Sequence, residues 1–173
     1  MLLTTHITPD FSGVEEVKQL YEGSFPETER IPWKRLWNLM PEGTMDGYYL
    51  NGKLTGMSYV YRFQDIAYLA YLAVVKEAQG NGYGTEILHL VKETCTDRRI
   101  VVDIEEVAAP ELEQKQRRKD FYLNNGYESC QVFYRFFSVD YELLSINGIV
   151  TASDWHALVR TMWGPWGRLA KFR

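Results

Sequence analysis

Cysteine is scarce in this sequence: the 173 residues include two, Cys95 and Cys130. They show no C-x-x-C spacing and fall in a helix-like and a strand-like segment. The pattern therefore argues against a disulfide framework or a zinc site and favours two reduced structural thiols. His6, His89 and His156 lie in different segments, which argues against a metal site and a nucleophilic triad. We expect no metal ion.

Long apolar runs and an excess of basic residues are also missing. No apolar stretch approaches the roughly 20 residues that cross a bilayer, and the start MLLTTHITPD has no basic region followed by a long apolar one. The formal net charge is −4, so there is no overall positive field of the kind that draws proteins onto nucleic acid or anionic lipid. We expect a cytoplasmic monomer or homodimer with neither nucleic acid nor membrane as a partner.

The composition that remains is that of a globular protein, with 46% hydrophobic and 14% aromatic residues. The length fits a single domain over residues 1–173, with a core to about residue 145 and a C-terminal helix with a basic, aromatic tail over 151–173. Thr151-x-x-Asp154 is a variant of the capping box that opens helices. The tail contains these tryptophans and basic residues: Trp155, Trp163, Trp166, Arg160, Arg168, Lys171 and Arg173.

Hydrophobic periodicity predicts an ordered series of strands and helices. Asn51-Gly52 joins two β-rich stretches as a hairpin turn, and a third follows, which makes a meander. Asn125-Gly126 ends a helix, with the glycine placed to adopt the left-handed conformation. The strand at IAYLAYLAVV, the helix at TEILHLVKE and the strand at RIVVDIEEV imply a parallel crossover. The expected order, β-α-α-β-β-β-α-β-α-β-β, runs through these segments: LLTTHIT, PDFSGVEEVKQLYEGSF, IPWKRLWNLM, MDGYYLNGKLTGMSYVYRF, IAYLAYLAVV, TEILHLVKE, RIVVDIEEV, ELEQKQRRKDFYLNNGY, SCQVFYRFFSV and YELLSI.

Three glycines occur in the six residues QGNGYG, between the third meander strand and the next helix. Glycine inside regular structure costs roughly 0.5–1 kcal/mol relative to alanine, so the cluster needs a tight turn or a ligand lying against bare backbone. A glycine-rich turn at a helix N-terminus also suits phosphate. The P-loop motif requires a lysine followed by Ser or Thr, which is missing here, and the dinucleotide motif has a different glycine spacing.

The segment resembles the acetyl-CoA pyrophosphate loop of the Gcn5-related N-acetyltransferases (GNAT), [RQ]-x-x-G-x-[GA], with Gln79, Gly82 and Gly84 at the motif positions. The element order resembles that family to about residue 145. The resemblance implies an α/β fold with a mixed, mostly antiparallel sheet, a central splayed parallel pair and helices on both faces. A second block, RRKDFYLNNGY, is similar to one found in many bacterial members, and its matching residues are Arg117, Arg118, Phe121, Tyr122, Asn125, Gly126 and Tyr127.

This resemblance implies acetyl-CoA as the acyl donor. Its pantetheine arm would lie along the backbone of Leu72, Ala73 and Val74, with the N–H of Val74 or a neighbour donating to the thioester carbonyl. A buried strand and a tight turn would account for the same residues without a ligand. The loop residues that would bind the cofactor are Gln79, Gly80, Asn81, Gly82, Tyr83, Gly84 and Thr85.

The resemblance also places Tyr122 as the general acid for the departing thiolate, although a helix tyrosine packed on the core is the alternative. Many relatives carry an asparagine seven residues earlier, where this sequence has Lys115. Asp103 and Glu105 are candidate bases that share one face of a strand because they are two residues apart. A solvated strand end is the alternative for both.

The expected function is acetyl transfer from acetyl-CoA to a primary amine, by direct attack in a ternary complex. Glu27 and Glu29 are further candidates for attracting the amine, with plain surface charge as the alternative. The acceptor is unknown, and we favour a small molecule over a protein. The alternative function is a catalytically weak or inactive CoA-binding regulatory module of the same fold, and a third is the use of another acyl-CoA.

Overall fold

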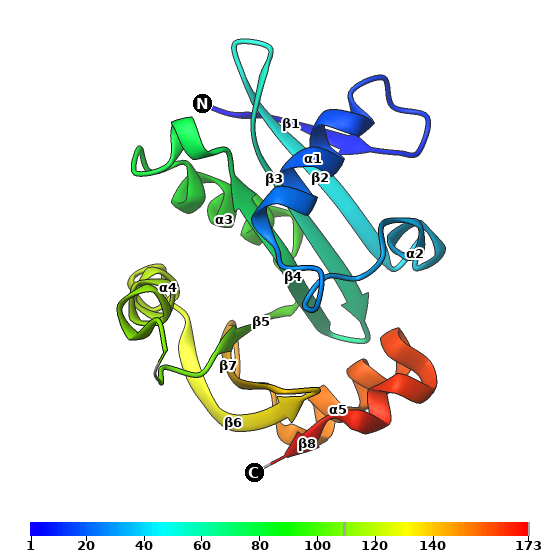
Figure 1. The fold of residues 1–173 in the computed structure, drawn as a ribbon, viewed down its shortest axis with the longest axis vertical. Coiled ribbons are helices and arrows are strands. Elements are labelled where there is room, and N and C mark those ends of the chain that lie inside the picture. Colours follow the sequence, from blue (N-terminus) through cyan, green and yellow to red (C-terminus); the bar gives the residue numbers. More distant parts are fainter. Residues whose placement is uncertain (109, 173) are drawn as a thin grey trace. The chain divides into compact units, whose positions relative to one another are not determined.

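A computed structural model describes residues 1–108 and 110–172, without the side chains of Trp166 and Arg168. The predictions for Trp166, Arg168 and Arg173 in the tail therefore lie outside the described residues. The elements are mixed helices and strands in the predicted order, with a further strand at the C-terminal end (Figure 1). Their bounds are β1 Leu3–Ile7, α1 Val14–Ser24, α2 Trp33–Asn38, β2 Gly43–Leu50, β3 Lys53–Phe63, β4 Ile66–Val74, α3 Tyr83–Thr94, β5 Arg99–Glu105, α4 Leu112–Asn124, β6 Glu128–Phe136, β7 Val139–Ile146, α5 Ala152–Trp163 and β8 Lys171–Phe172, with 3₁₀ turns at Lys76–Ala78 and Gly164–Leu169.

The strands form one mostly antiparallel sheet in the order β1-β2-β3-β4-β5-β7-β6-β8. β4 and β5 are the parallel pair, with Ile66–Tyr68 beside Arg99–Val101. The mixed α/β sheet with a parallel pair confirms the predicted fold class. The chain divides into two compact units, the first made of Met1–Arg62 with Leu69–Thr96, the second of Phe63–Tyr68 with the chain from Asp97 onward. The single domain over residues 1–173 stays a prediction.

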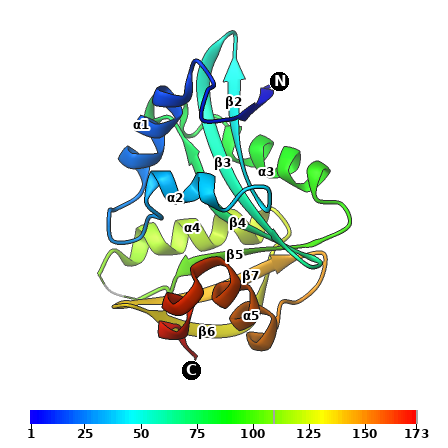
Figure 2. The same cartoon turned by 90° about the vertical axis from the view of Figure 1, so that its right-hand side faces the viewer.

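Helices cover both faces of the sheet within the first unit. On β3, the Tyr59 hydroxyl donates to the carbonyl of Leu36 in α2, while a Cβ added at Gly56 would lie 2.6 Å from Ile87 of α3. Positions 56 and 59 differ by an odd number, so they face opposite sides of the strand. Figure 2 shows the same arrangement, with α2 and α3 on different sides of β3.

In the second unit, helices likewise cover both faces of the strands β5, β7 and β6. Tyr141 and Glu142 are successive residues of β7 and so face opposite ways. Tyr141 stacks on Tyr134 of β6, which contacts Trp155 of α5, whereas Glu142 accepts from Lys119 of α4. The α5 helix therefore covers one face of these strands and α4 the other.

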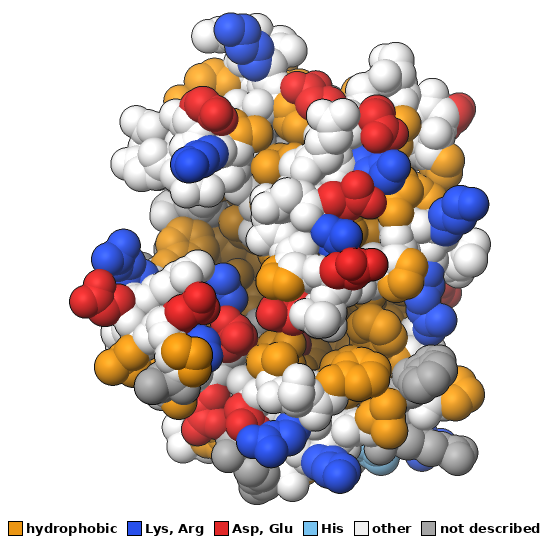
Figure 3. Space-filling view, in the orientation of Figure 1, with side chains coloured by type: hydrophobic (Ala, Val, Ile, Leu, Met, Phe, Trp, Pro, Cys, Tyr) orange, Lys and Arg blue, Asp and Glu red, His pale blue; other side chains and the backbone are white. Residues whose placement is uncertain are grey.

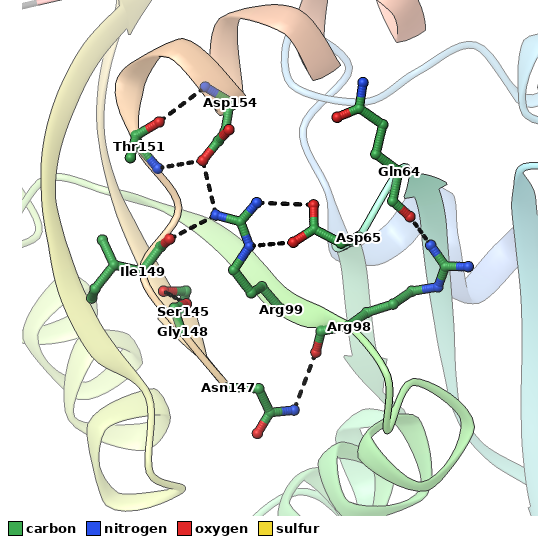
Figure 4. A network of polar contacts seen from close by, with 10 residues as sticks. All are labelled: Gln64, Asp65, Arg98, Arg99, Ser145, Asn147, Gly148, Ile149, Thr151 and Asp154. Atoms are coloured by element: carbon green, nitrogen blue, oxygen red, sulfur yellow. Dashed lines mark hydrogen bonds and ion pairs between the residues drawn. The ribbon is translucent and has the colours of Figure 1, made fainter.

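A guanidinium ties the start of α5 to the strands of this unit (Figure 4). Arg99, the first residue of β5, donates to both carboxylate oxygens of Asp65 at 2.8 and 2.9 Å, to Asp154 at 2.8 Å and to the carbonyl of Ile149 at 2.8 Å. Asp154 also completes the predicted capping box with Thr151. The first turn of α5 is thus held both by its own cap and by β5.

Several local predictions are confirmed. Asn51 and Gly52 have φ values of 51° and 77° in the turn between β2 and β3, α4 ends where predicted, and Gly126 has φ 87°. Cys95 and Cys130 are free and buried. Strand β8, which pairs with β6, was not predicted, because two residues are too few to show a period.

Candidate functional site

The glycine cluster forms the turn between β4 and α3 in the first unit. Gly80 and Gly82 have φ values of 78° and 82°, and Gly82 is the N-cap of α3. A Cβ added at either position would meet no atom within 4 Å. The backbone conformation therefore explains these glycines without any crowding by the protein. The same open space leaves the bare backbone accessible to a ligand.

Amide side chains within the turn hold its shape. The Gln79 side chain donates to the carbonyl of Val74 at 3.0 Å, which closes the turn across its ends. The Asn81 side chain donates to the carbonyls of Ala78 and Gln79 at 3.2 and 3.1 Å. Gln79 and Asn81 remain exposed. The Gln79 amide nitrogen, at a motif position of the family loop, thus organises the backbone of the turn.

The N-terminus of α3 has the physical properties of an anion site. Its N-cap residue, Gly82, makes no side-chain cap, the first N–H groups of a helix have no acceptor within the helix, and the helix dipole is positive there. Tyr83, Gly84 and Thr85 are half-buried in this first turn. Glu86 adds a carboxylate, but its Oε1 accepts from the backbone N–H of Leu2 at 2.6 Å. The turn and the helix start could hold a pyrophosphate.

The predicted pantetheine strand lies directly before this turn. Leu72 and Val74 are half-buried and share one face of β4, while Ala73 is 5% exposed on the other. Their structure agrees equally with a buried strand and with one that pairs with a ligand. Their role in cofactor binding stays a prediction.

Two tyrosines that sequence reasoning passed over fix the loop between α1 and α2. The Tyr21 hydroxyl donates to the carbonyl of Ile31 at 2.8 Å. The Tyr71 hydroxyl accepts from the N–H of Ile31 at 2.8 Å and donates to the carbonyl of Glu29 at 3.2 Å. The two rings meet edge to face with centroids 4.8 Å apart. Glu29 is half-buried in this fixed loop, whereas Glu27 is exposed.

Tyr122, the predicted acid, lies on α4 in the second unit. Its ring contacts those of Phe121 and Tyr127, with centroids 5.1 and 5.3 Å away, and it keeps part of its surface exposed. Burial raises the pKa of Tyr122 to about 12, although Arg118 opposes the shift. No hydrogen bond between side chains of the described residues uses its hydroxyl.

Glu105, one predicted base, is paired with two cations of α4. Its Oε1 lies 3.8 Å from Lys115 Nζ and its Oε2 lies 3.7 Å from Arg118 Nη1. Lys115 is the residue that departs from the family pattern, and its ammonium is directed to this carboxylate. Basic and acidic side chains are interspersed over α4 in Figure 3.

Asp103, the other predicted base, is held by two tyrosines instead of a cation. Tyr68 of β4 donates to Oδ1 at 2.7 Å and Tyr134 of β6 donates to Oδ2 at 2.6 Å. Burial raises the pKa of Asp103, while the bonds from Tyr134 and Tyr68 oppose the shift. Trp155 packs edge to face on Tyr68, with ring centroids 4.9 Å apart. We name Asp103, Tyr68 and Tyr134 the Tyr-Asp-Tyr cluster.

The predicted residues thus fall into two groups. The cofactor candidates, from Leu72 to Thr85, lie in the first unit, and Asp103, Glu105 and Tyr122 lie in the second. Within the described ranges, no three His, Cys, Asp or Glu side chains are grouped so that they could hold a metal ion. No helix among residues 1–108 and 110–172 is long and apolar enough to cross a membrane.

The sequence matches the acetyltransferase (GNAT) family over residues 14–127, which is more than half of the chain. The protein belongs to this family of acetyltransferases. No curated protein matches the sequence.

Solved structures share the fold at low sequence identity. A GNAT-family acetyltransferase from Bacteroides thetaiotaomicron has a TM-score of 0.72 and 19% identity, over 92% of this chain and 94% of its own. A Bacillus subtilis acetyltransferase in complex with CoA has a TM-score of 0.65 and 11% identity, over 86% and 100%. The aminoglycoside 6′-N-acetyltransferase from Enterococcus faecium has a TM-score of 0.64 and 14% identity, over 83% and 95%.

Proposed function

We propose that this protein is an N-acetyltransferase that moves the acetyl group of acetyl-CoA to a primary amine in a ternary complex. The observation that carries the proposal is the turn at Gly80 and Gly82, in a chain of the GNAT family. It combines open space over the backbone with a helix N-terminus whose N-cap residue makes no side-chain cap, which suits the pyrophosphate of CoA. The CoA complex of the Bacillus subtilis structure supports the same choice of donor.

Acetyl-CoA supplies an acetyl thioester, and the chain would supply the groups that bind it and move protons. Main-chain groups of Leu72, Ala73 and Val74 would bind the pantetheine arm, and the turn after them would bind the pyrophosphate. The Val74 N–H would donate to the thioester oxygen as negative charge develops on it. One such donor contributes about 2.7–4 kcal/mol in acyl-transfer enzymes.

Two proton transfers are needed in addition. Tyr122 would protonate the departing thiolate, because a phenol is protonated throughout the neutral range, as a proton donor must be. A carboxylate of β5, Asp103 or Glu105, would take the proton of the amine. Cys95 and Cys130 are both buried, which argues against either thiol as the carrier of a covalent acyl group.

The acceptor we favour is a small primary amine. The activity of a structural neighbour, the aminoglycoside 6′-N-acetyltransferase from Enterococcus faecium, supports this choice. Glu29, fixed by Tyr71, could attract its positive charge. An inactive CoA-binding module is the second candidate, because the ion pairs of Glu105 with Lys115 and Arg118 occupy one of the two candidate bases.

An acceptor screen tests the proposal. Release of free CoA thiol is followed at saturating acetyl-CoA with polyamines, aminoglycosides, amino acids and peptides with free N-termini. We expect thiol release with at least one amine and intersecting lines in two-substrate kinetics. Tight acetyl-CoA binding without turnover across the whole panel would favour the regulatory module instead.

A further inference from the structure

Asp103 differs from Glu105, the other candidate base, in the side chains that contact its carboxylate. Each of its oxygens accepts one phenolic hydrogen bond, at 2.7 Å from Tyr68 and at 2.6 Å from Tyr134. Among the ion pairs of the described residues, none includes Asp103. By contrast, Glu105 lies within 4 Å of two cationic side chains.

The hydrogen bonds leave Asp103 able to accept a proton. A carboxylate has about four lone-pair positions. The two phenols occupy one on each oxygen, and a backbone hydrogen bond takes a third. The side chain also keeps accessible surface, being half-buried, whereas Tyr134 is 3% exposed. The cluster therefore presents a carboxylate of fixed orientation with a free lone pair, and the ring of Trp155 packs on both tyrosines.

The strands make this orientation rigid. Tyr68 and Asp103 lie on the parallel neighbours β4 and β5, while Tyr134 reaches Asp103 from β6. The Tyr134 ring is itself stacked on Tyr141, with centroids 5.3 Å apart, and tilted against Trp155 at 5.7 Å. Neither phenol can turn away without disturbing a packed aromatic layer.

We propose that Asp103 is the group that takes the proton of the acceptor amine, and that Tyr68 and Tyr134 are positioning residues that hold its two oxygens. This inference rests on the proposed N-acetyltransferase function. In the step, an N–H bond of the ammonium breaks and an O–H bond forms on Asp103. The freed lone pair attacks the acetyl carbon, the C–S bond breaks, and the thiolate takes the proton of Tyr122. The nitrogen then loses a second proton as the amide forms, and this proton restores the phenol of Tyr122.

The charges around Asp103 favour this role over one for Glu105. From α4, Arg118 acts to lower its pKa, and Tyr122 lies near enough for Asp103 to raise the pKa of the phenol. Both phenols stabilise the ionised carboxylate against the effect of burial. Loss of either phenol should therefore raise the pKa of Asp103, and with it the pH at which the base becomes active.

The test compares kcat/KM against pH for one acceptor from the screen, in the parent protein and in Tyr134→Phe and Tyr68→Phe. Using the same acceptor throughout cancels the titration of the amine itself. The acidic limb is the part of the profile where kcat/KM falls as the pH is lowered. We expect its midpoint to rise by about one pH unit in each variant, the size expected for losing a hydrogen bond to a charged group. NMR titration of ¹³C-carboxyl-labelled aspartate should show the same shift at Asp103.

Two controls separate this role from a structural one. Tyr48→Phe also removes a buried phenolic hydrogen bond, the 2.9 Å contact to Ser58, and should leave the limb in place. Glu105→Gln should keep an acidic limb, because Asp103 remains to accept the proton. Tyr68 is the less buried of the two positioning tyrosines. If Tyr134→Phe does not fold, Tyr68→Phe can still be measured.

The outcomes are distinct. A limb that stays fixed while NMR shows the pKa of Asp103 rising overturns the proposal, and so does loss of the acidic limb in Glu105→Gln. Lower activity without any shift of the limb gives the tyrosines a structural role only and also overturns it. Failure of the parent to acetylate any amine in the panel overturns the proposed function itself, and it is seen before any variant is compared.

Discussion

Replacing Arg99 by methionine tests how the second unit holds helix α5. The guanidinium joins β5 to Asp65, to Asp154 and to the carbonyl of Ile149 (Figure 4). The apolar stem of Arg99 packs against Gly148, where an added Cβ would lie 3.2 Å from it. Methionine keeps most of this stem and removes only the charged group. The variant therefore isolates the polar contacts.

The size of the expected stability loss follows from how exposed each partner of Arg99 is. The Asp65 side chain is 58% exposed, so this pair is screened and contributes at most about 1 kcal/mol. The Asp154 side chain is 32% exposed against 21% for Arg99, and with the Ile149 carbonyl these contacts contribute roughly another 1 kcal/mol. We expect Arg99→Met to lower the free energy of unfolding by about 2 kcal/mol at pH 7.

The loss should also depend on pH. Hydrogen bonds from Arg99 lower the pKa of both Asp65 and Asp154. A carboxyl group whose pKa is lower in the folded state stabilises the fold above its unfolded pKa, near 3.9, and loses that contribution as pH falls through its folded value. The difference between parent and variant should thus be full at pH 7 and shrink below about pH 4.

Urea unfolding followed by tryptophan fluorescence at pH 7 and pH 3.5 measures both effects. Arg98→Met is the matched control, because its guanidinium contacts the Gln64 carbonyl and lies 3.8 Å from the exposed Asp97; it should change stability by less than about 0.5 kcal/mol. Equal stabilities of the Arg99 and Arg98 variants at pH 7, or a difference that grows as pH falls, would refute the reasoning.

Two further predictions concern α4. Tyr122→Phe should lower kcat by about 100-fold, the lower range for loss of a general acid, with acetyl-CoA affinity unchanged in calorimetry; an unchanged kcat would remove Tyr122 from the mechanism. Lys119→Met should lower the free energy of unfolding by roughly 3 kcal/mol, measured in urea. The reason is that Glu142, which is 2% exposed, loses the ammonium that lies 2.7 Å from its Oε2. Adding Glu142→Met should recover part of that loss. A double variant that is less stable than Lys119→Met alone would contradict the argument.

Local features were predictable because their causes are local. The turn at Asn51-Gly52, the helix end at Gly126 and the cap at Thr151 each follow from the conformations that a few neighbouring residues prefer. The turn at Gly80 belongs to the same class. Its positive φ is a conformation that glycine adopts at little cost because it has no Cβ.

The Tyr-Asp-Tyr cluster could not be predicted in the same way. Alternation placed Asp103 on one face of β5, but Tyr68 and Tyr134 come from strands 35 and 31 residues away in the sequence. Their meeting depends on sheet order, which periodicity does not reveal. For Glu105, the useful signal was Lys115, the departure from the family pattern, whose ammonium lies 3.8 Å from this carboxylate.

The central claim, that the turn at Gly80 binds acetyl-CoA, is tested most directly by calorimetric titration of the parent, Gly80→Ala and Gly52→Ala. Gly80 and Gly52 have φ values of 78° and 77° and open space at Cβ, so a methyl group strains both equally, by about 1–2 kcal/mol. We predict micromolar binding by the parent and by Gly52→Ala, and binding at least about tenfold weaker by Gly80→Ala, a difference of 1.4 kcal/mol. No binding by the folded parent, or equal affinities of the two variants, would contradict the account.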